Sequence, residues 1–150
     1  MILHFILLSL LWGSSFFGGT RVVDLHSSPA SGAWIVALYT TGCGHCKQLR
    51  PQFIRAASDL AAQCPAAKLG AIDCNQDPMV CQQFAVAGYP TLKVFMNGSE
   101  VMDYTGERDS DSIVNFVRES QAVRCSAKRP TRRIAVKKQG RFEKLWNKLF

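Results

Sequence analysis

Hydrophobic residues along this chain gather in short runs that predict strands. The two most apolar, WIVALY and KLGAID, are continuous and are typical of strands buried on both faces of a sheet. The last two runs are separated by Asn97-Gly98, the turn signal of a β-hairpin. The predicted strands are RVVDL at 21–25, WIVALY at 34–39, KLGAID at 68–73, TLKVFM at 91–96 and EVMDYT at 100–105.

Three other stretches predict helices. The first follows a Cys-Gly-His-Cys motif, carries apolar residues at helical spacing, and has Pro51 as an expected kink. The second is a short helix around Met79–Phe84, and the third begins at a cap provided by Asp109 or Ser110. Strands and helices in this order predict an α/β fold with a mixed central sheet flanked by helices.

The N-terminal stretch predicts a cleaved secretory signal. Residues 2–12 are apolar but too few to span a bilayer comfortably, and small residues follow them, so cleavage is expected between Ser15 and Gly19. No Lys or Arg precedes the apolar run, and an uncleaved anchor is the alternative. The expected organisation is a signal peptide at 1–19, a folded domain at 20–123 and a basic tail at 124–150.

Charge separates the domain from the tail. Residues 1–123 carry eight Lys and Arg against ten Asp and Glu, a net charge of −2, whereas residues 124–150 carry ten against Glu143 alone, a net charge of +9. The tail ends in an apolar stripe at helical spacing, which predicts an amphipathic helix with basic residues beside it. The stripe consists of Phe142, Leu145, Trp146, Leu149 and Phe150.

Such a tail suits an anionic membrane surface or an acidic protein, and a solvated extension without a partner is the alternative. Nucleic acid is not expected as a partner in a secretory location. The predicted secretory signal makes the endoplasmic reticulum lumen or the exterior the expected location. The chain ends in NKLF, without a KDEL-type retention signal.

The CGHC motif predicts thiol–disulfide chemistry. Cys43 is expected at a helix N-terminus, where free N–H groups and the helix dipole favour the thiolate that attacks disulfides. His45 can share protonation with that thiolate, and Cys46, one turn later, can close a disulfide with Cys43. A structural disulfide or half of a zinc site are the alternatives, but no second ligand pair has the spacing of a zinc ribbon. We therefore expect a redox pair with neither a metal nor an organic cofactor.

Two separated motifs resemble those of the protein disulfide isomerase family. CGHCKQLRPQF resembles its active-site signature and GYPTLKVFMNG its second hallmark, and among its members the first thioredoxin domain of quiescin sulfhydryl oxidases is most similar. The resemblance implies a thioredoxin-like fold over about residues 20–123. It implies that Pro90 is a cis-proline facing the active cysteines, where substrate binds, and that Arg108 is a mobile arginine that lowers the pKa of the second cysteine. A solvated loop arginine is the alternative for Arg108.

The sequence departs from this family at several positions. Ala37 and Ala71 stand where isomerases usually have a buried acid and its lysine partner, which relay protons at the second cysteine. Gly42 stands where a tryptophan usually covers the site, and the eight residues 26–33 leave no room for the family's first helix. The resemblance therefore implies a fold with a shortened or missing first helix and slow resolution of mixed disulfides by Cys46.

Six cysteines and a secretory signal predict oxidising surroundings. Cys74 and Cys81 are expected to form a local disulfide, whereas Cys64 and Cys125 can pair with each other, remain free or bond a partner. The sequence thus predicts a thiol–disulfide oxidoreductase that acts on protein clients. The alternative is a non-catalytic or weakly catalytic protein that binds clients through the same groove and the tail.

Overall fold

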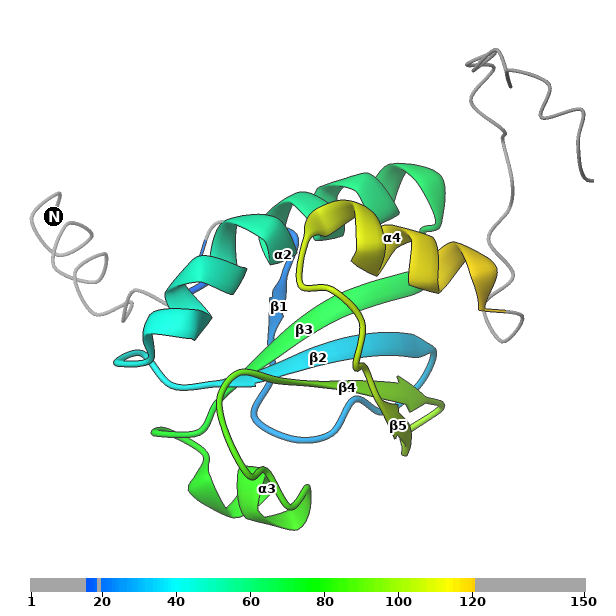
Figure 1. Ribbon diagram of the computed structural model, residues 1–150. Coiled ribbons are helices and arrows are strands. Elements are labelled where there is room, and N and C mark those ends of the chain that lie inside the picture. Colours follow the sequence, from blue (N-terminus) through cyan, green and yellow to red (C-terminus); the bar gives the residue numbers. More distant parts are fainter. Residues whose placement is uncertain (1–15, 19, 121–150) are drawn as a thin grey trace, which may run out of the picture.

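The computed structural model describes residues 16–18 and 20–120, which form a five-stranded mixed sheet in the order β1-β3-β2-β4-β5 with helices on its faces (Figure 1). This confirms the predicted α/β fold, although β1 is shorter than expected. The elements are β1 (Val23–Asp24), β2 (Ala33–Tyr39), α2 (Gly44–Gln63), β3 (Ala67–Asp73), α3 (Pro78–Gln83), β4 (Thr91–Met96), β5 (Ser99–Asp103) and α4 (Ser110–Glu119).

Strand β2 lies at the centre of the sheet, and all of its residues are buried. It pairs in parallel with β3 and antiparallel with β4. Its side chains alternate between the two faces, so that Ile35 joins the main core under α2 and α4, whereas Val36 joins a smaller cluster on the opposite face. Burial on both faces explains why the sequence shows an uninterrupted apolar run here.

No helix lies between β1 and β2, which confirms the predicted loss of the first helix. Residues 25–32 instead cross the second face of the sheet as a loop (Figure 1). Leu25 approaches Gly70 so closely that a Cβ at Gly70 would lie 2.5 Å from Leu25 Cδ1. The indole Nε1 of Trp34 donates to the carbonyl of Ser31 at 2.7 Å. This loop and the α3 region, through Val80 and Phe84, therefore cover the second face of the sheet.

Helix α4 begins as predicted, at Asp109, whose carboxylate accepts a hydrogen bond from the backbone N–H of Ser112 at 2.9 Å. It packs beside α2 on the first face of the sheet, where Gln52 Oε1 accepts from the backbone N–H of Ser110 at 3.1 Å (Figure 1). The two helices bury the main hydrophobic core against the sheet.

The segment just before the predicted domain also packs into this core. Phe17 is 1% exposed, and its ring lies edge-on to Tyr39 and to Phe53. Phe16 stacks on Tyr39 with 4.9 Å between ring centroids, and Arg50 Nε donates to the Phe16 carbonyl. The predicted cleavage range of Ser15 to Gly19 therefore includes residues that belong to the folded core. Among the described residues, no helix is long and apolar enough to cross a membrane.

Cys74 and Cys81 form the predicted local disulfide, which joins the end of β3 to α3. Cys64 is fully buried at the end of α2 and is also disulfide-bonded. Cys125 and the predicted amphipathic helix at the C-terminus lie outside the described residues. The remaining two cysteines are the free thiols Cys43 and Cys46.

Candidate active site

The two free thiols lie at the N-terminus of α2, at the end of the sheet where β2 stops. Cys43 is the N-cap of the helix and has an extended backbone, and its Sγ accepts a hydrogen bond from the backbone N–H of Cys46 at 3.2 Å. Cys43 is partly exposed, whereas Cys46 is 1% exposed. The structure thus shows an accessible thiol and a buried one within a single helical turn.

A cis peptide bond faces these thiols from the loop before β4. It joins Tyr89 to Pro90, and the Cys43 thiol donates to the Tyr89 carbonyl at 3.4 Å. Pro90 is buried, whereas Tyr89 is 39% exposed. The structure therefore brings together two motifs that lie more than 40 residues apart in the sequence.

The environments of the two thiols move their pKa values in opposite directions. The hydrogen bond from Cys46 lowers the pKa of Cys43, and the backbone N–H groups of Cys46 and His45 and the charge of Arg108 act in the same direction. Burial, followed by the hydrogen bond with Cys43, raises the pKa of Cys46 to about 11. The arrangement favours a thiolate at Cys43 and a neutral thiol at Cys46, as nucleophilic attack by Cys43 requires.

Arg108, in the loop between β5 and α4, lies beside the same cis-proline. Its Nη2 donates to the Pro90 carbonyl at 3.2 Å, and its positive charge lowers the pKa of both Cys43 and Cys46. The guanidinium is thus oriented by the backbone of the cis-proline loop, and its charge acts on both thiols.

His45 acts on the Cys43 thiol through its backbone, and a role for its imidazole stays a prediction. Its side chain is exposed, and within the described part of the chain the ring makes no hydrogen bond. Its effect on the Cys43 thiol comes from the backbone N–H at the start of the helix. That contribution depends on helix geometry and not on the imidazole.

The positions of the usual acid and lysine are apolar and adjacent. Ala37 in β2 and Ala71 in β3 are register partners, and Leu92 of β4 pairs with Ala37 on its other side. All three residues are buried in the core that also contains Cys46. A single buried charge at either position would be strongly unfavourable, so it is physically consistent that alanine takes the place of both the acid and the lysine.

The position before Cys43 leaves the site open on one side. Gly42 is exposed, and a Cβ placed on it would have no other atom within 4 Å. A side chain at this position would therefore start from open space, which glycine leaves unfilled.

Sequence reasoning missed the aromatic cluster next to Cys46. Burial raises the pKa of Tyr39, and the charges of Asp73, Asp24 and Cys46 raise it further, so the phenol stays protonated near Cys46. The Phe16–Phe17 pair packs on this ring, but its position after an apolar run predicts that it belongs to the signal peptide.

In the described ranges, His, Cys, Asp and Glu side chains do not gather in threes that could hold a metal ion.

Comparison with known proteins agrees with this geometry. A family model described as Thioredoxin matches residues 24–119. The chain is 37% identical over 117 residues to a probable protein disulfide-isomerase ER-60 of Schistosoma mansoni, covering 74% of this chain and 24% of that protein. It is 38% identical over 86 residues to a protein disulfide-isomerase of Gallus gallus, covering 56% of this chain and 17% of that protein. The chain thus spans about a quarter or less of the length of these relatives.

Solved structures show the same fold. The zinc-bound form of human ERp44 superposes with a TM-score of 0.61 at 23% identity, covering 65% of this chain and 30% of that one. The J-Trx1 fragment of ERdj5 gives a TM-score of 0.57 at 27% identity, covering 65% and 50%. The finer resemblance to quiescin sulfhydryl oxidases stays a prediction. The chain belongs to the thioredoxin family, with protein disulfide isomerases among its relatives.

Proposed function

We propose that this protein is a thiol–disulfide oxidoreductase of the secretory pathway that forms or isomerises disulfides in protein clients. The observation that supports this most strongly is the pair of unlike thiols, an accessible Cys43 with a lowered pKa and a buried Cys46 with a raised one, facing a cis-proline. Neighbouring thiols with such different environments are suited to an ordered two-step exchange.

In the oxidising direction, a client thiolate attacks Cys43 Sγ of the Cys43–Cys46 disulfide, and Cys46 leaves and takes up a proton. A second client thiolate then attacks the client sulfur bonded to Cys43 and expels the Cys43 thiolate. Two electrons pass from the client to the protein, and the client gains one disulfide. The lowered pKa of Cys43 makes it a good leaving group in this second step.

In isomerisation, the Cys43 thiolate attacks a wrong client disulfide and forms a mixed disulfide. Release then takes place by attack of another client thiol, or by attack of Cys46 on Cys43 Sγ when no client thiol is in position. Because Cys46 is buried and its pKa is about 11, it attacks slowly at neutral pH.

Refolding of a client with scrambled disulfides tests this function. The unchanged protein should restore client activity in a glutathione buffer, and Cys43→Ala should abolish that gain, while the exposed His45→Ala variant should retain most of it. No gain over buffer with the unchanged protein would contradict an oxidoreductase role.

A second candidate function is client binding with little or no turnover. The apolar pair Ala37 and Ala71 and the open position at Gly42 favour it, because they remove the proton relay and the lid that support rapid exchange in the family. Client capture by Cys43→Ala at the level of the unchanged protein, together with absent refolding activity in the latter, would support binding over catalysis.

For the organisation of the chain, we propose a secretory leader that ends before Phe16, a thioredoxin domain up to about residue 123, and the basic tail at 124–150. The boundary is moved from residue 19 because Phe17 is buried against Tyr39 and Phe53. Residence in the endoplasmic reticulum lumen or secretion is part of this proposal, supported by the Cys74–Cys81 disulfide, which is typical of oxidising compartments.

A further inference from the structure

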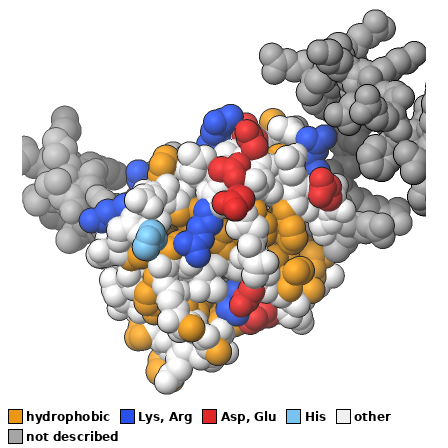
Figure 2. All heavy atoms as spheres, in the orientation of Figure 1, with side chains coloured by type: hydrophobic (Ala, Val, Ile, Leu, Met, Phe, Trp, Pro, Cys, Tyr) orange, Lys and Arg blue, Asp and Glu red, His pale blue; other side chains and the backbone are white. Residues whose placement is uncertain are grey.

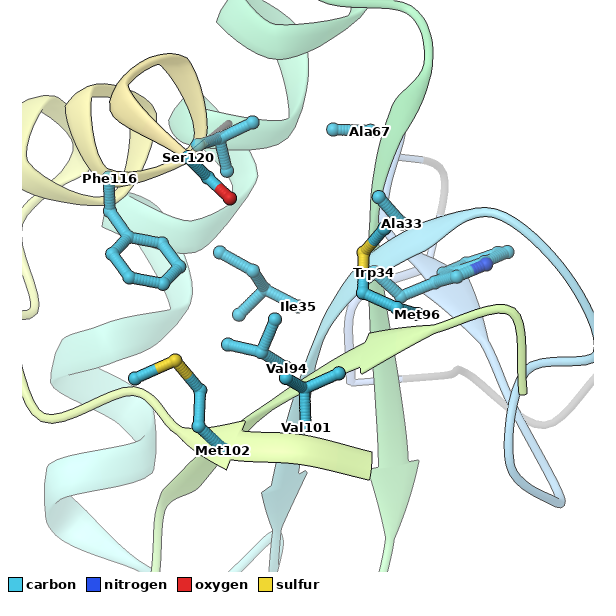
Figure 3. Close-up of a pocket in the computed structure, with 11 residues that line it drawn as sticks. Ala33, Trp34, Ile35, Ala67, Val94, Met96, Val101, Met102, Phe116 and Ser120 are labelled. Carbon is cyan, nitrogen blue, oxygen red and sulfur yellow. The ribbon is translucent and has the colours of Figure 1, made fainter. Parts of the chain in front are cut away.

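A hydrophobic cavity of about 70 Å³ lies near the start of β2, whereas the CGHC motif lies beyond the end of that strand. Its lining includes Ala33, the first residue of β2, whereas Cys43 lies four residues beyond Tyr39, the last residue of that strand. Phe116 of α4 and Val94 of β4 point into it from opposite sides (Figure 3). The walls are largely apolar, so a ligand would have to bring hydrophobic side chains.

An irregularity in the hairpin enlarges this apolar surface. The pairing between β4 and β5 shifts between Val94 and Phe95, so that Met102 pairs with Val94 and Glu100 with Phe95, with Val101 as the extra residue between them. A β-bulge redirects side chains, and both Val101 and Met102 line the cavity although they are consecutive. Val101 and Met102 are 56% and 49% exposed, respectively. Exposure of two neighbouring apolar side chains beside an apolar cavity is unfavourable unless another segment covers them.

The chain itself supplies a segment suited to this surface. Ser120, the C-cap of α4, lines the cavity, so the chain leaves the described domain at its rim. Thirty residues follow, and their last nine carry apolar side chains at the spacing of one helical face. We propose that the C-terminal segment 142–150 docks into this cavity with its apolar face, covering Val101 and Met102.

The linker permits this contact. Twenty-one residues separate Ser120 from Phe142, and a chain of that many residues reaches about 70 Å at most when fully extended. Tethering of this kind gives an effective concentration on the order of 1 mM. A contact with an intrinsic dissociation constant of about 0.1 mM would therefore be closed in roughly nine molecules out of ten.

Charge favours the same occupant. Figure 2 shows hydrophobic side chains gathered below α4 and over the hairpin, with acidic side chains above and below them. Glu100 and Asp103 share the single ammonium of Lys93, at 2.8 and 2.7 Å, which leaves net negative charge on the hairpin. The tail carries a net charge of +9, so its basic residues suit this rim. Glu100 and Asp103 against Lys93 thus give the hairpin a charge opposite in sign to that of the tail.

Methyl NMR of methionine in the full chain tests this docking. Met96 and Met102 line the cavity, whereas Met79 lies on α3 and is 69% exposed, so its signal serves as an internal control. Replacing Trp146→Asp should shift the signals of Met96 and Met102 and leave that of Met79 unchanged, because the indole ring current and the apolar contact are lost together. The matched substitution Asn147→Ala, beside the stripe, should shift none of them.

Hydrogen exchange supplies the reciprocal test. Val101→Asp should increase exchange in segment 142–150, whereas Val23→Asp, at the opposite edge of the sheet and 41% exposed, should not. Unchanged Met96 and Met102 signals in Trp146→Asp would overturn the proposal. So would shifts that grow with protein concentration, because these indicate docking to a second copy. Cosedimentation of the chain with phosphatidylserine vesicles through its tail, with Met96 and Met102 signals that do not depend on the tail, would also overturn it.

Discussion

The release of a mixed disulfide by Cys46 should depend steeply on pH. Burial raises the pKa of this thiol to about 11. A group with that pKa is only about 0.01% thiolate at pH 7, and this fraction rises about tenfold with each pH unit. Part of the shift comes from Cys43 and is lost when Cys43 is bonded to a client, but burial is the largest cause and remains. The first-order attack of Cys46 should therefore accelerate about 100-fold between pH 7 and pH 9.

Stopped-flow reaction of the reduced protein with 5,5′-dithiobis(2-nitrobenzoate) separates the two steps. Attack by Cys43 releases one equivalent of coloured thiolate at a rate proportional to reagent concentration, and attack by Cys46 releases a second at a rate independent of it. The rate of the Cys43 phase should stop rising at a lower pH than the rate of the Cys46 phase does, because hydrogen bonding to the Cys43 sulfur lowers its pKa. Cys46→Ser should release only the first equivalent at early times.

A second phase that is flat between pH 7 and pH 9, or that levels off below pH 8, would refute this reasoning. Either result would mean that Cys46 loses its proton readily despite its burial, with the help of a group other than the acid that Ala37 replaces.

Three further predictions concern the surroundings of the site. Phe17→Ala should lower the free energy of unfolding by about 3–5 kcal/mol in urea titrations, because Phe17 is 1% exposed and packs on two aromatic rings; a loss below 1 kcal/mol would return the domain boundary to residue 19. Ala37→Glu alone should lower the free energy of unfolding by about 3–5 kcal/mol. Adding Ala71→Lys should restore part of this stability and speed the Cys46 phase at pH 7, because the two positions are register partners. Arg108→Gln should raise the pKa of both thiols and slow the Cys43 phase at pH 7, whereas Arg108→Lys should slow it less; equal rates in all three proteins would remove Arg108 from the site.

The strands and helices could be predicted because their signals are local. WIVALY is buried on both faces and reads as a continuous run, and Asp109 caps α4 next to the residues it caps. The start of α2 at the CGHC motif follows in the same way from neighbouring residues. The contact of Cys43 with the Tyr89 carbonyl joins distant segments. The spacing of residues does not indicate this contact; only the family resemblance implies a cis-proline at Pro90 facing the cysteines.

Other features depend on tertiary packing that leaves no mark in a local pattern. Phe17 enters the core, but its neighbours in sequence form an apolar run that predicts a leader. The bulge at Val101 interrupts a strand whose sequence looks regular, and the approach of Leu25 to Gly70 becomes apparent only when the loop crosses the sheet. The backbone N–H of His45 lowers the pKa of Cys43, a contribution that comes from the start of the helix and is not visible in the identity of the side chain.

The reduction potential of the Cys43–Cys46 pair, measured by equilibration with glutathione, tests the central claim most directly. An oxidoreductase that donates disulfides needs a dithiol form that is stabilised relative to the disulfide, and the lowered pKa of Cys43 provides this. We predict a potential between about −180 and −230 mV, in the range of isomerases and glutaredoxins. A value below about −300 mV, as reducing as a structural disulfide, would contradict the account.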